Sequence, residues 1–401
     1  MFQKSFRSKQ EERADVGGVL AVLAKPVVER ALSAEENFQP SPALDEFSTI
    51  AGMMDSVSTA PWPHRLLSNE APGSARSLNR PLTIRLSIAM PPQGVNLYTP
   101  NGSMRWGAST FELNPPADSP CDFWVVHSYS AEIETARVAP ANTLFINGEP
   151  PAKKRYPRAF YNQFHHVVDS HPNTGHPRTI LYAPCVGWHV GLDSFNSRYA
   201  FGYDFLKTLP PPAKQNRISV VCSNTAKTAG QQQRLAFLAA LKKRLGDQVV
   251  HFGRGFTPVG DKMEVIAPYR YNLVLENSVS PHYWTEKLAD AYLGWAFPVY
   301  SGCPNLGEYF PPDSFLPIDI RDQDGAIRTI ENLLKRSEPP DLTGVAQARQ
   351  LMLDHYNPFA ICDRLAQQLF VAAPAELVTI RNHRVFRPWR RFLSWFKRPH
   401  T

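Results

Sequence analysis

Short runs of apolar residues recur from residue 82 onwards, and longer polar stretches separate them. Runs of this length that end in small or polar residues are typical of buried β-strands. Because long connections separate the runs between 81 and 210, we expect their strands to form a mainly parallel sheet. The predicted strands of this part are 82–90, 121–129, 142–148 and 179–184.

Strand-like and helix-like patterns alternate regularly from residue 216. The segment 231–247 carries four leucines on one stripe, which is typical of an amphipathic helix. An alternation of strand, loop and helix predicts a Rossmann-like domain. The strands predicted here are 217–224, 248–253, 271–277 and 297–302, and the predicted helices are 231–247, 285–296 and 325–337.

Residues 1–80 lack this regularity. Their stretches at 37–46 and 69–81 are rich in Pro, Ser and polar residues, as loops are, and one helix is expected over 11–32. This part is an accessory extension or is partly disordered. We therefore divide the chain into an N-terminal extension at 1–80, a first Rossmann-like domain at 81–210, a second one at 211–375 and a basic tail at 376–401.

The composition is that of an ordinary soluble globular chain, with 43% hydrophobic and 20% charged residues. No stretch approaches the ~20 uncharged apolar residues that a membrane-spanning helix needs, and the N-terminus lacks the apolar core of a signal peptide. We therefore expect a cytoplasmic protein. The five cysteines are scattered and show no CxxC spacing, which favours free thiols in a reducing compartment over a disulfide framework.

The net charge of +7 lies entirely in the C-terminal tail. From Thr379 to Thr401 the chain holds six Arg, one Lys and no acidic residue, which leaves 36 basic and 36 acidic residues elsewhere. In this tail Trp389, Phe392 and Phe396 share one face of a predicted helix that is otherwise cationic. We expect it to bind the anionic inner face of a membrane. The alternative is a terminal helix packed on the protein itself. A nucleic-acid partner is not expected, because the rest of the chain is neutral.

A cluster of polar residues follows a strongly apolar predicted strand, in the stretch "YNLVLENSVSPHYWTEK". Ligands of open parallel sheets bind beyond the carboxyl ends of the strands, where helix N-termini favour anions. The cluster therefore predicts a site for a phosphate-bearing ligand, with Lys287 on the phosphates and Glu286 on ribose hydroxyls. The alternative is a solvated first turn of a helix that has Thr285 as its N-cap.

The complete string from 271 to 315 resembles the donor-binding signature of the α1,3/4-fucosyltransferases. The resemblance implies an inverting, bacterial-type enzyme of the α/β class with the GT-B fold, in which two Rossmann-like domains face each other across a cleft. The order and the spacing of the motif elements both agree. The matching elements are Glu276-Asn277-Ser278, Tyr283-Trp284-Thr285-Glu286-Lys287, Phe297-Pro298-Val299-Tyr300-Ser301-Gly302 and Pro312-Asp313-Ser314-Phe315.

The resemblance also implies the residues that hold the donor, GDP-fucose. Arg234, Tyr283 and Lys287 would carry the diphosphate, while Glu286 and Asn272 would contact the sugar of the nucleotide or its neighbours. The strand end that precedes the arginine also matches, although the gap to the arginine is longer here than in the family. The donor-binding residues implied in this way are Ser223, Asn224, Arg234, Asn272, Asn277, Tyr283, Glu286 and Lys287.

Glu149 is the catalytic base that the resemblance implies. It stands in "NTLFINGEPP", just beyond the predicted strand 142–148 of the first domain, which would bind the acceptor. An inverting transfer needs a carboxylate that takes the proton from the attacking acceptor hydroxyl. The diphosphate leaves from the opposite face, so the base belongs to the other domain. The alternative is a loop acid in front of a Pro-Pro turn.

Four histidines are close in sequence, His165, His166, His171 and His176, but they do not predict a metal site. The alternation in "FHHVVDS" sends the first two to opposite faces of a strand, and no known ligand spacing is present. The chain also lacks a P-loop and a GxSxG motif. We expect no metal and no cofactor, with GDP-fucose as the donor substrate.

The residues and the resemblance together predict an enzyme that moves L-fucose from GDP-fucose to a glycan acceptor. The acceptor would be N-acetyllactosamine-like or contain N-acetylglucosamine, and the linkage would be α1,3 or α1,4. One alternative is an inverting GT-B transferase that uses another nucleotide sugar. The other is a non-catalytic protein that binds a nucleotide sugar or acts as a membrane adaptor.

Overall fold

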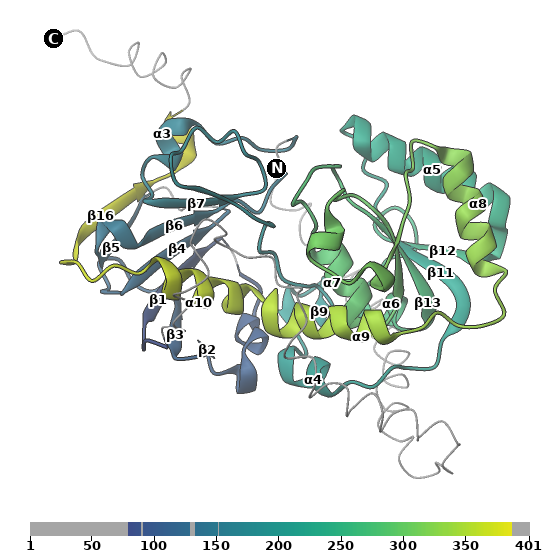
Figure 1. Ribbon diagram of the computed structural model, residues 1–401, viewed down its shortest axis with the longest axis horizontal. Helices are drawn as coiled ribbons and strands as arrows, with labels where there is room; N and C mark the ends of the chain where they lie inside the picture. Colours follow the sequence, from purple (N-terminus) through teal and green to yellow (C-terminus); the bar gives the residue numbers. More distant parts are fainter. Residues whose placement is uncertain (1–78, 90, 129–132, 151, 387–401) are drawn as a thin grey trace, which may run out of the picture. The chain divides into compact units, whose positions relative to one another are not determined.

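The computed structural model describes residues 79–89, 91–128, 133–150 and 152–386. All of them belong to one compact unit, Trp62–Thr401. The helix expected over 11–32 and the amphipathic helix expected around Trp389 lie outside the described residues. Figure 1 shows two sheets, one with β1, β4, β6 and β7 and one with β11, β12 and β13, which we call the sheets of the N-terminal and the C-terminal lobe.

The N-terminal lobe contains a seven-stranded sheet with the order β2-β3-β1-β4-β6-β7-β8. All neighbours run parallel except β2 and β3, which pair antiparallel at one edge. The predicted mainly parallel sheet is therefore confirmed. The strands are β1 (Thr83–Ile88), β2 (Arg105–Trp106), β3 (Ser109–Leu113), β4 (Phe123–His127), β6 (Thr143–Ile146), β7 (His166–Asp169) and β8 (Thr179–Leu181).

Strand β4 shows why this sheet was recognisable in the sequence. Phe123 and Val125 belong to a hydrophobic cluster on one face of the sheet, and Trp124 and Val126 to another cluster on the opposite face. All four side chains are fully buried. Because both faces are covered, the strand is a continuous apolar run rather than an alternating one.

One face of this sheet is covered by a helix from near the end of the chain. Helix α10 (Pro358–Leu369) begins at the N-cap Asn357 and contributes Phe359 to the cluster. The ring of Phe359 meets that of Phe111 in β3 edge-on, with 5.0 Å between the ring centroids. The helix thus takes the place that a crossover helix occupies in a regular Rossmann domain.

The opposite face is covered by short elements. They are α3 (Arg158–Tyr161) and an antiparallel ribbon of β5 (Ile133–Val138) with β16 (Glu376–Arg381). Ile380 of β16 is fully buried against Trp124 and its neighbours. The first six residues of the predicted tail 376–401 are therefore a strand of the N-terminal lobe.

The C-terminal lobe has a fully parallel five-stranded sheet with the order β12-β11-β13-β14-β15. Every strand and helix predicted between 216 and 337 is present, so the Rossmann-like alternation is confirmed; β15 and α6 are additional. The strands are β11 (Gln215–Val221), β12 (Val249–Phe252), β13 (Tyr269–Leu275), β14 (Phe297–Ser301) and β15 (Leu316–Pro317), and the helices are α5 (Ala229–Leu245), α6 (Met263–Ile266), α7 (Glu286–Leu293) and α8 (Gln323–Leu334).

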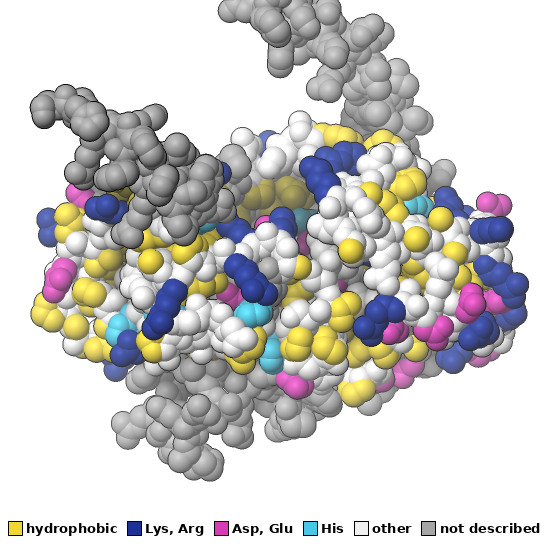
Figure 2. Space-filling model, turned by 90° about the horizontal axis from the view of Figure 1, so that it is seen from above, with side chains coloured by type: hydrophobic (Ala, Val, Ile, Leu, Met, Phe, Trp, Pro, Cys, Tyr) yellow, Lys and Arg dark blue, Asp and Glu magenta, His cyan; other side chains and the backbone are white. Residues whose placement is uncertain are grey.

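Helices α5 and α8 pack on one face of this sheet, where Leu241 and Ile330 share a hydrophobic cluster with residues of β11 and β13. On the outside, Glu331 forms ion pairs with Arg244 (3.0 Å) and Lys335 (2.9 Å). Figure 2 shows Lys and Arg side chains interspersed with Asp and Glu at the right of the view, where these helices lie. The helices therefore present a surface of mixed charge.

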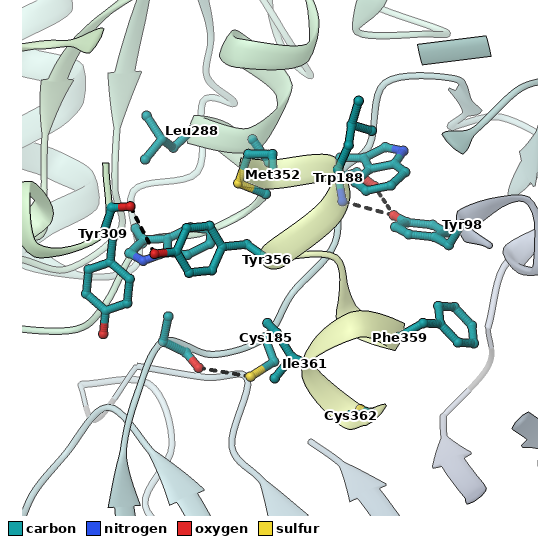
Figure 3. Packing of buried hydrophobic residues seen from close by; sticks show 14 of the residues in the cluster. Tyr98, Cys185, Trp188, Leu288, Tyr309, Met352, Tyr356, Phe359, Ile361 and Cys362 are labelled. Carbon is teal, nitrogen blue, oxygen red and sulfur yellow. Dashed lines mark hydrogen bonds between the residues drawn. The ribbon is translucent and has the colours of Figure 1, made fainter. Parts of the chain in front are cut away.

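A third group of elements connects the two sheets, since the chain passes from the N-terminal to the C-terminal sheet at 192–208 and returns at 343–355. Figure 3 shows Tyr98 and Trp188, whose rings stack at 4.1 Å, in one cluster with Leu288, Met352 and Tyr356. This cluster contains residues of both lobes, so they share a hydrophobic core. The elements in this region are α4 (Tyr203–Thr208), β9 (Leu192–Asp193), β10 (Arg198–Tyr199), α9 (Thr343–Gln350) and a π-helical turn (Leu351–His355).

Two further expectations concern cysteines and membrane spans. All five cysteines are free thiols, as predicted. Within the described ranges, no helix combines the length and the apolar character that crossing a bilayer requires.

Candidate active site

The carboxyl end of β13 is joined to the start of α7 by a buried carboxylate. Glu276 follows the last residue of β13 and is 5% exposed. Its Oε1 accepts hydrogen bonds from the backbone N–H (2.8 Å) and the hydroxyl (3.0 Å) of Thr285. Thr285 is the N-cap of α7, as predicted, and accepts from the N–H of Lys287. Glu276 therefore fixes the place at which α7 begins.

Lys287 lies between two carboxylates in the first turn of α7. Its Nζ is 3.4 Å from Oε2 of Glu276 and 3.0 Å from Oε1 of Glu286. Burial would lower the pKa of this lysine, but the two carboxylates raise it by more, so its pKa lies above the usual range. The side chain is 20% exposed. The arrangement holds a permanent cation at a helix N-terminus, which is where an anion binds best.

Glu286 has a pKa well below its ordinary value. Burial would raise the pKa of this carboxyl, but Lys287, Lys262 and His189 lower it by more. The Nζ of Lys262 is 2.6 Å from Oδ2 of the buried Asp290 in α7. Oδ1 of Asp290 accepts from the backbone N–H of His189 (2.5 Å) and of the residue after it (3.0 Å). Helix α7 is thus tied to the segment before β9, and a second cation stands beside its first turn.

Arg234 reaches the same end of β13 from helix α5. Its guanidinium is buried, and Nη1 donates to the backbone oxygen of Leu275 (3.2 Å). Its buried Nε has no hydrogen-bond partner among the described residues. Burial raises the pKa of the Cys222 thiol, and the charges of Arg234 and Lys287 both oppose that rise. The two cations therefore lie around the same strand ends.

The hydroxyl of Tyr283 interacts electrostatically with carboxylates of both lobes. It is 3% exposed, and burial raises the pKa of its hydroxyl above the usual range. Glu276 raises this pKa further, and the other carboxylates that do so are Glu286 and Glu149. The phenol of Tyr283 therefore stands near the predicted donor residues and near the predicted base.

Asn272 is held inside the sheet rather than beyond its edge. Its Nδ2 donates to the hydroxyl (2.9 Å) and the backbone oxygen (3.2 Å) of Ser219 in the neighbouring strand. It lines a small cavity with Lys262, Lys287 and Asp290. The side chain thus joins β11 to β13 next to the cations.

The other three predicted donor residues lie at the same sheet edge. The hydroxyl of Ser223 donates to that of Thr225 (3.1 Å). Asn224 packs so closely on Gly255 that a Cβ there would stand 2.2 Å from the Asn224 amide nitrogen. A Cβ on Gly230, in the first turn of α5, would lie 3.0 Å from the backbone oxygen of Asn277. These residues shape the strand ends, and the glycines allow the close approach.

Glu149 follows the carboxyl end of β6 in the N-terminal lobe. Its side chain is 30% exposed, and its carboxylate accepts from Nζ of Lys153 at 2.7 Å. Its backbone N–H donates to Oδ1 of Asn147 (3.1 Å). A Cβ on Gly148, the residue before it, would lie 2.2 Å from the hydroxyl of Ser128, so the glycine allows a close approach here. The turn that presents Glu149 is therefore tightly packed.

A buried polar network supports this turn from the next strand. Nδ2 of Asn147 donates to Oδ2 of Asp169 at the end of β7 (2.9 Å), and the hydroxyl of Tyr161 donates to the same oxygen (2.8 Å). Burial lowers the pKa of His127 at the end of β4, while two backbone carbonyls and Glu149 oppose the shift. Glu149 thus lies at the common edge of β4, β6 and β7.

The histidine-rich segment forms no obvious ligand set. The rings of His165 and His166 lie 4.7 Å apart. Nε2 of His176 is bonded to the backbone oxygen of Phe164 (3.1 Å), and Nδ1 of His171 accepts from a backbone N–H. Across the described part of the chain, no three His, Cys, Asp or Glu side chains are grouped as a metal site would require.

Sequence reasoning gave no site role to three charged residues found here. Glu276 had a signal, since it stands in the matched motif and a carboxylate directly after a buried strand seldom lacks a partner. Lys262 and Asp290 had none, because they lie 28 residues apart and meet only in the folded chain.

Comparisons with known proteins point to one family. Residues 211–336 match the family model "Glycosyltransferase family 10 (fucosyltransferase) C-term". The alpha-(1,3)-fucosyltransferase FucT of Helicobacter pylori is 30% identical over 178 residues, which are 43% of this chain and 36% of that protein. The human 3-galactosyl-N-acetylglucosaminide 4-alpha-L-fucosyltransferase FUT3 is 40% identical over 73 residues, which are 17% of this chain and 20% of that protein. The chain thus spans well under half the length of these relatives.

Solved structures show more distant similarity. The crystal structure of an alpha1,3-fucosyltransferase with GDP-fucose has 18% sequence identity and a TM-score of 0.38, over 84% of this chain and 95% of that one. The crystal structure of the glycotransferase of kitacinnamycin has 12% identity and a TM-score of 0.35, over 73% of this chain and 100% of that one.

The segment matched by the family model includes the whole cluster around Lys287, from Arg234 on α5 to the first turn of α7. The α/β architecture with two parallel sheets agrees with the fold that the resemblance implied. Over residues 211–336 the chain is thus similar to glycosyltransferase family 10, the fucosyltransferases.

Proposed function

We propose that this protein transfers L-fucose from GDP-fucose to a hydroxyl of a glycan acceptor, with inversion at the anomeric carbon. The observation that carries the proposal is the buried Lys287, held between two carboxylates at a helix N-terminus with Arg234 at the neighbouring strand end. Two cations at the carboxyl edge of a parallel sheet are suited to a diphosphate. The named activity of the relatives supports fucose as the transferred sugar.

The donor residues then have separate tasks. Lys287 and Arg234 would neutralise the diphosphate, and the Nε of Arg234, which has no partner in the described part of the chain, is a donor that a phosphate oxygen would satisfy. Tyr283 would donate its hydroxyl to the same group. Glu286, held ionised by its cationic neighbours, would accept hydrogen bonds from sugar hydroxyls. Asn272 would contact the sugar of the nucleotide or its neighbours from the cavity that it lines.

Glu149 is the proposed general base. Its carboxylate takes the proton of the acceptor hydroxyl as that oxygen forms a bond to the anomeric carbon of fucose. The bond between this carbon and the diphosphate breaks, and GDP leaves with the electron pair. The cations at Lys287 and Arg234 stabilise the charge that grows on GDP. The ion pair with Lys153 keeps the carboxylate oriented before the acceptor binds.

The acceptor in this proposal is an N-acetyllactosamine-like or other N-acetylglucosamine-containing glycan, and the linkage is α1,3 or α1,4. The named acceptors of the relatives support this class. Release of GDP tests it directly. GDP-fucose with N-acetyllactosamine should give acceptor-dependent GDP, while GDP-mannose or UDP-galactose should not. Turnover of another nucleotide sugar would support a different inverting transferase, and binding without turnover would support a non-catalytic protein.

We also propose that the reaction needs no metal ion, since basic side chains serve the phosphates. Activity should therefore survive dialysis against EDTA at the rate of the untreated enzyme. A loss of activity that Mn²⁺ or Mg²⁺ restores would contradict this, and would make the segment with His165 and His166 a candidate again.

A further inference from the structure

The loop between β13 and α7 is held in a strained conformation at one residue. His282 has φ +59°, in the left-handed region that side chains with a Cβ seldom adopt. It directly precedes Tyr283 and stands three residues before the N-cap Thr285. A strained residue persists only where its surroundings determine it.

The surroundings of His282 supply three contacts from the segment after β14. Its backbone N–H donates to Oδ1 of Asn305 (2.8 Å). Its Nδ1 is 2.7 Å from the hydroxyl of Tyr309 and 3.1 Å from Nδ2 of Asn305. Because the amide nitrogen can only donate, Nδ1 is the acceptor of this contact, and it can accept from the tyrosine hydroxyl as well. The contacts therefore require an unprotonated Nδ1.

The partner residues are themselves fixed. Tyr309 is fully buried, and its ring meets that of Trp284 edge-on at 5.8 Å between centroids. Nδ2 of Asn305 also donates to Oε2 of Glu308 (2.9 Å). His282 and Trp284 thus both contact Tyr309, and the residue between them in the sequence is Tyr283.

We propose that His282 is a positioning residue for the donor site. Its imidazole ties the loop to Asn305 and Tyr309, and this anchor sets the position of Tyr283 beside the cations. His282 does not itself contact the donor; it acts through Tyr283 and through the N-cap of α7. This proposal rests on the proposed function, because it assigns Tyr283 to the diphosphate of a nucleotide sugar.

Three substitutions separate the backbone strain from the side-chain anchor. His282→Gly relieves the positive φ but removes the anchor, so GDP affinity should fall by about 10-fold, the scale of two lost hydrogen bonds. His282→Asn tolerates the left-handed conformation and places Oδ1 near the position of Nδ1, so it should keep most of the affinity. Tyr309→Phe removes one donor and should weaken GDP binding by a few-fold. Val279→Gly, at a 62% exposed position of the same loop, is the matched control for added loop freedom.

Calorimetric titration of the full chain with GDP gives the readout, with the melting temperature measured in parallel. A lower affinity in His282→Gly, recovery in His282→Asn and no change in Val279→Gly would support the anchor. Equal affinity of His282→Gly and wild type would overturn it, and so would a lower melting temperature with unchanged affinity, which is the sign of a merely structural role. If the wild type does not bind GDP at all, the proposed function fails first.

Discussion

At the scale of single residues, Lys287 is the most important residue of the proposed donor site, because its charge lies at the centre of the donor cluster. We expect Lys287→Ala to lower kcat/KM for GDP-fucose by about 100-fold, since a cation beside a leaving diphosphate stabilises charge that develops in the transition state. Steady-state kinetics measure this. Lys335→Ala removes a lysine that is 68% exposed on α8 and should leave the kinetics unchanged. Normal turnover by Lys287→Ala would place the donor elsewhere.

Glu149 gives the second prediction at this scale. Glu149→Gln keeps the shape of the side chain but cannot take a proton, so transfer should fall by about 100- to 10,000-fold while GDP affinity stays at the wild-type value. GDP release and calorimetric GDP binding measure the two properties separately. Glu331→Gln, on the surface of α8, is the control for the loss of one carboxylate. Near-normal transfer by a folded Glu149→Gln protein would assign the base to another acid.

At the scale of elements, the side chain of Asp261 joins two segments of the chain, the one before β9 and the one at the start of α6. Its Oδ1 accepts from the backbone N–H of Gly191 (2.8 Å) and of Met263 (2.9 Å). Burial raises the pKa of this carboxyl to about 6, although the two N–H groups oppose the shift. The segment before β9 is thus joined to the start of α6 by a carboxyl that titrates near neutral pH.

This pKa predicts a change of stability with pH. Because the folded-state pKa lies above the ordinary value of 3.8, the native state binds more protons than the unfolded chain between 3.8 and about 6. The contribution of Asp261 to the free energy of unfolding should therefore rise as pH falls through this window, by roughly 3 kcal/mol at most.

Urea unfolding of the wild type and of Asp261→Asn at several pH values tests this. The asparagine keeps an oxygen acceptor for both N–H groups but does not titrate, so the difference between the two proteins should grow in favour of the variant as pH rises from about 4 to about 6, and level off above pH 6. A difference that stays constant from pH 4 to pH 7 would show that Asp261 titrates at its ordinary pKa.

The elements also show which strands and helices could be predicted from local sequence patterns. Strand β13 and helix α7 were predictable because an apolar run, the N-cap Thr285 and helical spacing lie within one stretch of chain. Strands β2 and β3 were missed, since they form a short antiparallel edge in which few positions are buried. Ribbon β5–β16 was missed because its two strands are far apart in sequence and only Ile380 of β16 is fully buried.

At the scale of the whole molecule, the chain returns to the N-terminal lobe through β16, which pairs with β5. The tail can therefore be removed only beyond this strand. Truncation after Phe386 should leave a folded, active protein, because it keeps every element that the structure describes. Truncation after Leu377 would remove Ile380 and most of the pairing of β16 with β5. Losing a buried isoleucine alone costs about 2–5 kcal/mol, so this shorter protein should melt at a clearly lower temperature.

Full-length protein and protein truncated after Phe386 test the predicted membrane role of residues 387–401. Full-length protein should sediment with anionic vesicles, since five tail cations contribute roughly 1 kcal/mol each near such a surface. Protein truncated after Phe386 should remain in the supernatant, and added salt should weaken the binding of the full chain. Equal sedimentation of both proteins, or unfolding after truncation at Phe386, would favour a tail that packs on the protein.

The sequence by itself determined the order of strands and helices around the donor motif, because hydrophobic periodicity and capping act over a few neighbouring residues. It also placed Lys287 in the first turn of the helix that follows one strand and Glu149 just beyond another strand, at the edge where parallel sheets bind ligands. The tertiary structure alone decided that Lys262 meets Asp290, that Glu276 holds the start of α7, and that α10 and β16 complete the N-terminal sheet. Such contacts form between segments that are far apart in the sequence. They depend on how well these segments pack and on the total apolar surface that the fold buries, and a local sequence pattern specifies neither.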